Sequence, residues 1–149
     1  MKRVLVAGAT GHLGAYVAKE FKARGYFVRA LVRSSKKLNG LWESCDEIVE
    51  GQITEPKTLD DVCDGIDLVF SSVGITRQKD GLTFKDVDYQ GNTNLLEVAI
   101  KAGVKKFVYV SAFNGPNLRH LDIIDAHEAF VDELKATDIE YSVLRPTGY

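Results

Sequence analysis

A glycine-rich turn near the start of the chain separates a short apolar run from a helical pattern. Residues 4–7 are all apolar, and the turn that follows reads Gly8-Ala9-Thr10-Gly11-His12-Leu13-Gly14. Glycine at position 8 permits a tight turn off a strand, and glycine at position 14 lets a helix pack closely on the sheet. The absence of a side chain at position 11 leaves the backbone N–H groups of residues 11–13 open to an anion.

We therefore predict that the turn binds the phosphates of a dinucleotide. The predicted contacts are Gly8, Thr10, Gly11, His12, Leu13 and Gly14. The placement between a strand and a helix makes such a glycine motif specific, and a tight turn without a ligand is the alternative interpretation. We interpret His12 as a polar residue at the helix start rather than as a catalyst.

Short apolar runs alternate with longer amphipathic segments along the whole chain. The predicted strands are residues 4–7, 27–32, 47–49, 68–70, 107–110 and 141–144. Apolar residues at helical spacing predict four helices: Leu13, Val17 and Phe21 before Gly25; Leu59, Val62 and Cys63 after Pro56; Val87, Leu95, Val98, Ala99 and Ala102 before Gly103; and Phe130, Val131 and Leu134. The alternation predicts an α/β fold with a doubly wound parallel sheet. For a dinucleotide-binding sheet of about six strands, the expected order is 3-2-1-4-5-6.

Size and composition narrow the classes of partner. The 149 residues fit one domain, and the formal net charge of -2 argues against a nucleic-acid partner. No apolar run approaches the roughly 18 residues of a membrane span, so we expect no membrane association. Cys45 and Cys63 lack metal-ligand spacing, so we expect no metal site and two reduced thiols in a cytoplasmic protein.

The glycine spacing G-x-x-G-x-x-G resembles that of the extended and atypical short-chain dehydrogenase/reductases. Residues 87–96 look like the family's fourth-helix signature, and residues 106–111 look like its fifth strand. Residues 133–134 and 141–148 resemble the atypical branch that contains the NmrA-like and isoflavone-reductase-like proteins. The similarity covers essentially the whole chain, and it implies that residues 1–149 form a single NAD(P)-binding Rossmann domain. Family members usually continue into a substrate-binding region, which we expect to be absent here.

The end of the second predicted strand bears on the choice of cofactor. This position, roughly 20 residues after the glycines, normally contacts the adenosine ribose. It holds Arg33-Ser34-Ser35-Lys36-Lys37, and no carboxylate occurs between Val28 and Gly40. Arg33 has the planar fork that suits a phosphate, and Lys36 or Lys37 adds charge. We therefore predict that Arg33 and Lys37 favour NADP(H) over NAD(H); a solvated basic loop is the alternative.

The resemblance also implies contacts at two further strand ends. Gln52 and Ile53 stand where the family usually carries an aspartate, which touches adenine, followed by an apolar residue. Gln52 departs from that pattern, but its amide can both donate and accept hydrogen bonds. Ser72, Val73 and Gly74 follow the fourth predicted strand, where the cofactor is expected to cross the carboxyl edge of the sheet.

The catalytic residues that the resemblance implies are incomplete. Carbonyl-reducing family members use an asparagine, a serine and a Tyr-x-x-x-Lys pair, and no tyrosine in this chain precedes a lysine by four residues. Ile123 and His127 stand at the Tyr and Lys positions, Asp88 stands at the Asn position, and the Ser position is Ser111 or Ala112. His127 and Ser111 are therefore the candidate catalytic residues. The alternative for His127 is a solvent-facing cation held by Asp125 and Glu128.

Two functions remain open from the sequence. The first is the cofactor domain of an NADP-dependent oxidoreductase that acts on an unknown small molecule. The second is a non-catalytic NADP(H) sensor that acts on a regulatory protein partner, as the NmrA-like resemblance implies. A third function is a scaffold that binds RNA or protein on this fold. The net charge of -2 argues against RNA as its partner.

Overall fold

The computed structural model describes residues 1–36, 38, 40–75 and 80–147, which form one six-stranded sheet. Its strands are β1 (Arg3–Ala7), β2 (Phe27–Val32), β3 (Glu47–Glu50), β4 (Leu68–Ser71), β5 (Lys106–Val110) and β6 (Glu140–Leu144). Their order is β3-β2-β1-β4-β5-β6, and every neighbouring pair is parallel. The predicted fold class and strand order are confirmed.

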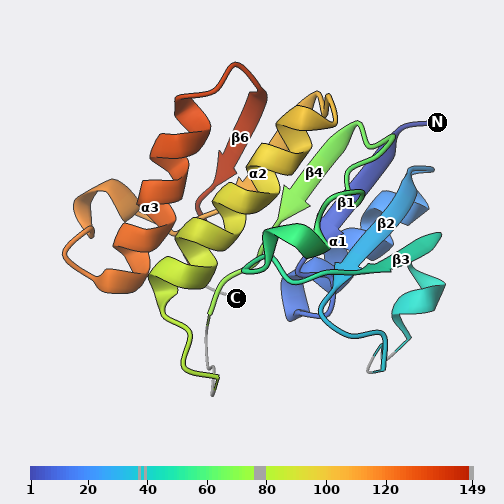
Figure 1. Cartoon of the computed structure of the whole chain (residues 1–149), viewed down its shortest axis with the longest axis horizontal. Coiled ribbons are helices and arrows are strands. Elements are labelled where there is room, and N and C mark those ends of the chain that lie inside the picture. Colours follow the sequence, from blue (N-terminus) through green and yellow to red (C-terminus); the bar gives the residue numbers. More distant parts are fainter. Residues whose placement is uncertain (37, 39, 76–79, 148–149) are drawn as a thin grey trace.

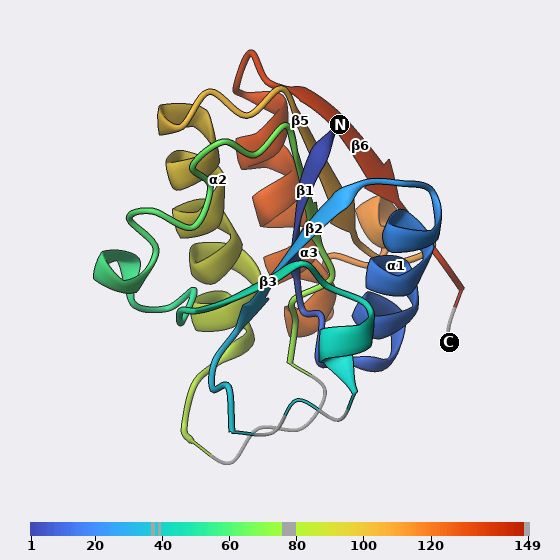
Figure 2. The same ribbon diagram turned by 90° about the vertical axis from the view of Figure 1, so that its right-hand side faces the viewer.

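Helices cover both faces of this sheet (Figure 1). Helix α1 (His12–Ala23) lies on one side, and α2 (Asn92–Lys101) and α3 (Asp122–Lys135) lie on the other (Figure 2). Alternate residues of β1 therefore enter two cores: Val4 packs on the α1 side, and Leu5 packs on the side of α2 and α3. Burial on both faces explains the nearly continuous apolar runs of the strands. None of the helices in the described part of the chain has the length and apolar character needed to cross a bilayer.

The helix predicted after Pro56 is wrong. Only a three-residue 3-10 turn, η2 (Pro56–Thr58), forms there, and Val62 and Cys63 are buried within turns. The buried Arg29 explains the difference, because its Nη1 donates to the carbonyl oxygens of Val62 and Asp64, both at 2.9 Å. Those carbonyls are therefore engaged by a side chain instead of a helical hydrogen-bond ladder. The other 3-10 turns are η1 (Leu41–Glu43) and η4 (Gly115–Asn117).

The helix predicted to run up to Gly103 exists, but its first part is not an α-helix. Residues Lys85–Gly91 form a π-helix, η3, which continues directly into α2. Two carbonyls of η3 accept hydrogen bonds from side chains: Asn92 Nδ2 donates to Asp88 at 2.9 Å, and Thr93 Oγ1 donates to Tyr89 at 2.9 Å. Such widened turns are rare and occur frequently at functional sites.

Candidate functional site

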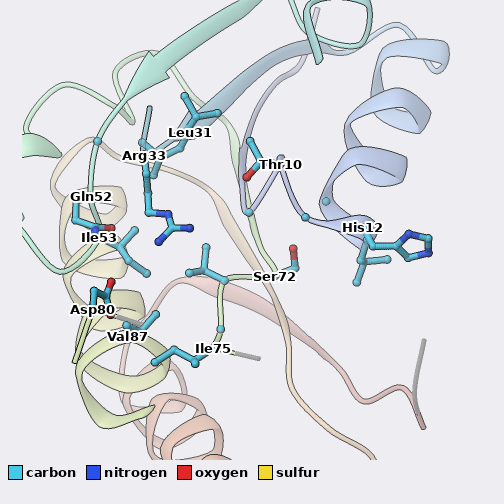
Figure 3. A pocket seen from close by; sticks show the side chains of 18 residues that line it. Thr10, His12, Leu31, Arg33, Gln52, Ile53, Ser72, Ile75, Asp80 and Val87 are labelled. Atoms are coloured by element: carbon cyan, nitrogen blue, oxygen red, sulfur yellow. The ribbon is translucent and has the colours of Figure 1, made fainter. Parts of the chain in front are cut away.

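A cavity of about 800 Å³ opens at the carboxyl edge of the sheet, where the β1–α1 turn meets the ends of β2, β3 and β4 (Figure 3). The connections from β1 and β4 diverge here, which is the switch point where open α/β sheets bind ligands. The described residues with predicted cofactor contacts all line this cavity: Gly8, Thr10, Gly11, His12, Leu13, Gly14, Arg33, Gln52, Ile53, Ser72, Val73 and Gly74. Lys37, the remaining predicted contact, lies outside the described residues.

The conformation and close packing of the β1–α1 turn require glycine at two positions. Gly8 has a φ of +88°, in the left-handed region that glycine adopts at little cost. A Cβ on Gly14 would lie 2.0 Å from the Gly8 carbonyl oxygen, so α1 could not begin this close to the turn with any other residue. A Cβ on Gly11 would meet only that carbonyl oxygen, at 3.2 Å, so the space beside Gly11 is otherwise open.

The first turn of α1 presents backbone donors to the cavity. The hydrogen bond from Ala15 N–H to the Gly11 carbonyl, at 3.0 Å, starts the helical ladder, so the N–H groups of residues 12–14 precede it. The prediction of an open N–H at Gly11 is wrong, because this group donates to the Gly8 carbonyl at 2.9 Å within the turn. The first turn contains no acidic residue, and the N-cap Gly11 has no side chain to bond these groups. This geometry suits the phosphates of a nucleotide.

The side chain of His12 does not join these backbone donors in facing the cavity. It is exposed and packs edge-on against Tyr16, with ring centroids 5.2 Å apart. Figure 3 shows the imidazole pointing away from the other labelled side chains of the cavity. His12 therefore offers the cavity its backbone, as expected for a residue at a helix start.

Arg33 follows β2 directly, and its guanidinium points into the cavity (Figure 3). Glu50, at the end of the neighbouring β3, holds the loop that carries it: Ser35 donates its hydroxyl to Glu50 and its N–H to the same oxygen at 2.8 Å. The hydrogen bond from the Ser35 hydroxyl lowers the pKa of Glu50 most, and the one from the Ser35 N–H lowers it further. The sequence near Arg33 gives no sign of this carboxylate, because Glu50 belongs to a different strand.

The ends of β3 and β4 provide the other walls, held from behind by buried polar side chains of η3 and α2. Each of three side chains makes one hydrogen bond to the wall backbone: Asp88 Oδ2 accepts the N–H of Ile75 at 3.2 Å, Asn92 Nδ2 donates to the Val73 carbonyl at 3.2 Å, and Asn94 Nδ2 donates to the Ile53 carbonyl at 2.8 Å. All three are at most 6% exposed. These positions went unnoticed from sequence, except Asp88, because polar residues in a helical pattern suggest a solvent-facing side.

Several further cavity residues carried no sequence signal. They are Leu31, Val32, Gly51, Ile75, Asp80 and Val87. Val32, Gly51 and Ile75 each extend a predicted contact by one residue along the same strand end. Asp80 lies beside Val87 on the wall opposite the glycine turn (Figure 3), and nothing in its local sequence indicated a place in the site.

The surroundings predicted for His127 are wrong. Its side chain is only 15% exposed, and neither Asp125 nor Glu128 contacts it. Instead Nε2 lies 2.8 Å from Oδ1 of the fully buried Asp88, and Nδ1 lies 2.9 Å from the hydroxyl of the buried Tyr109. Residues one and two positions away on an α-helix face other directions, which is why sequence neighbours were a poor guide.

Ser111, the other catalytic candidate, belongs to a different buried network. Its hydroxyl donates to Glu128 at 2.9 Å, and Arg145 donates to both oxygens of Glu128, at 2.6 and 3.1 Å. Ser111 and Glu128 are 5% and 3% exposed, and the network joins the residue after β5, helix α3 and the residue after β6. Neither Ser111 nor His127 is among the residues that line the cavity.

The comparisons with known proteins agree with this site. Residues 8–149 match the family described as NAD(P)H-binding, and the chain belongs to that family. The Photosystem II assembly factor Ycf39 of Synechocystis sp. is 35% identical over 147 residues, which cover 99% of this chain and 45% of that protein. The chain thus spans about half the length of the curated relatives it matches.

Solved structures show the same fold. A putative NAD-dependent epimerase/dehydratase from Bacillus halodurans superimposes with a TM-score of 0.82 at 28% identity, covering 99% of this chain and 71% of the other. The Citrobacter sp. triphenylmethane reductase complexed with NADP(H) gives a TM-score of 0.79 at 23% identity, covering 100% and 50%. The chain is therefore an NAD(P)-binding Rossmann domain of the short-chain dehydrogenase/reductase type.

Proposed function

We propose that this domain binds NADP(H) in preference to NAD(H) and serves an oxidoreductase as its cofactor domain. Arg33 carries the proposal, because its guanidinium points into the cavity from the end of β2. A guanidinium binds a phosphate through paired, charge-assisted hydrogen bonds, and NADP(H) differs from NAD(H) by its 2′-phosphate. The nearby carboxylate of Glu50 accepts hydrogen bonds from the hydroxyl and the N–H of Ser35.

The chain's own residues suggest the orientation of the cofactor. The N–H groups at the start of α1 would hold the pyrophosphate, and Gln52 and Ile53 would contact the adenine. The nicotinamide would then lie at Ser72, Val73 and Gly74, beyond the glycine turn. When bound, the reduced cofactor supplies a hydride for transfer to a substrate.

The preference for NADP(H) is tested by replacing Arg33. We expect Arg33→Ala to weaken NADPH binding by about tenfold or more and to leave NADH affinity nearly unchanged, because charge-assisted hydrogen bonds to the 2′-phosphate are lost. Isothermal titration calorimetry at one fixed salt concentration measures both affinities. Arg24→Ala is the matched control, since Arg24 is exposed and follows the far end of α1. Equal affinities of the parent chain for NADPH and NADH would refute the preference.

For the enzyme candidate, the proton donor that we propose is His127, which lies behind the cavity wall at Gly74. Its contacts with Asp88 and Tyr109 fix the imidazole behind Gly74, at the proposed nicotinamide end. Histidine can act as a general acid near neutral pH. For Ser111, the hydrogen bond to the buried Glu128 supports a structural role instead.

A non-catalytic NADP(H) sensor is the second candidate. The missing Tyr-x-x-x-Lys pair favours it, as does a relative whose name describes an assembly factor rather than an enzyme. Its partner would be a regulatory protein, whereas the enzyme would take a small-molecule substrate. Burial raises the pKa of Cys45 to about 11 and of Cys63 to about 12, so both thiols stay protonated near neutral pH. Two free thiols suit the cytoplasmic location that we propose.

Turnover distinguishes the two candidates. We expect chain 1–149 to oxidise NADPH at a background rate with a panel of aldehydes and quinones, because the tyrosine of the Tyr-x-x-x-Lys pair is missing and the loss of such a general acid typically costs about 10²–10⁴ in rate. Absorbance of NADPH during incubation with each substrate measures this rate. Enzyme-like turnover that disappears in His127→Ala would instead establish His127 as the acid and exclude the sensor.

A further inference from the structure

A buried carboxylate lies directly behind the cavity wall at Gly74. Gly74 lines the cavity, and a Cβ built on it would lie 2.6 Å from Asp88 Oδ1 and 3.6 Å from His127 Nε2. Because Gly74 has no side chain, only its backbone separates the Asp88 carboxylate from the cavity at this point. Asp88 is fully buried, so water screens its charge poorly.

Within the described residues, this carboxylate has one titratable partner at ion-pair distance. Asp88 Oδ1 lies 2.8 Å from His127 Nε2, while Oδ2 accepts a neutral backbone N–H from Ile75 at 3.2 Å. The pair therefore carries one negative charge when the imidazole is neutral and no net charge when it is protonated. A single proton thus changes the electrostatic potential behind Gly74.

The groups that face His127 come from two elements. They are Asp88 from η3 and Tyr109 from β5. The other charged groups around α3 make their contacts elsewhere: Glu128 with Arg145, Arg119 with Asp125 and Asp132, and Glu133 with Tyr89. Asp88 is therefore the acidic group in contact with the imidazole within the described residues.

We propose that the Asp88–His127 pair sets the relative affinity of the site for the oxidised and the reduced nucleotide. Oxidised nicotinamide carries a positive charge and reduced nicotinamide carries none, while the rest of the dinucleotide is identical. A negative charge behind Gly74 favours the oxidised form, and a proton on His127 removes that preference. The inference rests on the proposed function, specifically on binding of the nicotinamide at Ser72–Gly74.

The ratio of the NADP⁺ and NADPH affinities isolates this effect. The 2′-phosphate also gains a proton in weakly acidic solution, but it is common to both forms and cancels in the ratio. We expect the affinity for NADP⁺ relative to NADPH to fall by about tenfold between about pH 8 and about pH 6, as imidazole protonation neutralises the pair. Fluorescence or calorimetric titration of chain 1–149 with each form measures the two affinities.

Three variants locate the effect. Asp88→Asn should lower the ratio by about tenfold at about pH 8 and abolish its pH dependence, since the negative charge is gone. His127→Gln should show the same ratio of NADP⁺ to NADPH affinity as the parent at about pH 8. This ratio should not change when the pH is lowered. Asp86→Asn is the matched control, because Asp86 is an exposed carboxylate of the same helix that bonds Thr83 and does not contact His127.

The two proposals fail differently. If both forms bind with parental affinity ratios in Asp88→Asn and His127→Gln at both pH values, the inference is wrong while the proposed function stands. If the parent chain binds neither form, the proposed function fails first. Circular dichroism verifies that each variant is folded. If Asp88→Asn does not fold, His127→Gln alone tests the inference. Its ratio of NADP⁺ to NADPH affinity must then be independent of pH, unlike that of the parent.

Discussion

Gly8 and Gly14 are required for different physical reasons. Gly8 needs a left-handed φ of +88°, and a Cβ there would in addition lie 2.8 Å from the side-chain Oγ of Ser72. Gly14 needs room alone, because a Cβ there would lie 2.0 Å from the Gly8 carbonyl oxygen and 3.0 Å from Ala9 Cα. Both obstacles at Gly14 are backbone atoms, which cannot rotate away as a side chain can. The turn can accept a side chain at position 14 only by moving α1 away from β1.

Gly14→Ala should therefore cost about 3 kcal/mol of unfolding free energy, the upper end of the range for overpacking a tight site. Chemical denaturation of parent and variant measures the difference. Gly25→Ala is the comparison, since Gly25 has a φ of +81° but no atom within 4 Å of an added Cβ, and it should cost only about 1 kcal/mol. A Gly14→Ala variant as stable as Gly25→Ala would contradict the steric account.

Individual site residues were predictable from sequence where their role depends on local backbone. The glycines and Arg33 belong to this group, since a turn or a strand end fixes their position. His127 does not, because its contacts with Asp88 and Tyr109 come from segments distant in sequence. Glu50 was missed for the same reason: its contact with Ser35 exists only once β3 lies beside β2.

At the level of elements, η3 and α2 act as a support for the cavity. Their buried side chains bond the backbone of Ile53, Val73 and Ile75, which follow β3 and β4. Apolar periodicity predicted a helix here, because Leu95 and Ala99 face the core. It could not predict the π-helix, which depends on the side chains of Asn92 and Thr93 bonding carbonyls of the preceding turn.

Asn94→Ala tests this support. The change leaves the buried Ile53 carbonyl without its hydrogen bond from Asn94 Nδ2 and should cost about 2 kcal/mol of unfolding free energy. Urea denaturation monitored by circular dichroism measures it. Asn117→Ala removes an amide-to-amide hydrogen bond to Asn114 at an exposed site and should change stability by less than about 0.5 kcal/mol. Similar costs for the two variants would argue against a supporting role for Asn94.

For the whole molecule, the strand order determines where the site lies. The apolar runs and amphipathic helices predicted a doubly wound parallel sheet, and the glycine turn selected the order that is usual for dinucleotide-binding sheets. The order β3-β2-β1-β4 brings the ends of four strands, far apart in sequence, around one cavity. The glycine turn after β1 is at the centre of this group, so it is the position at which a dinucleotide would meet both halves of the sheet.

Calorimetric titration of NADPH into the parent chain and into Gly11→Val tests the central claim most directly. A Cβ at Gly11 would have one neighbour, the Gly8 carbonyl oxygen at 3.2 Å, so the fold should largely persist while the valine fills the space needed by the phosphates. We predict saturable one-site binding to the parent and no measurable binding to a folded Gly11→Val. Binding of NADPH to Gly11→Val as tightly as to the parent would show that the nucleotide does not lie at this turn.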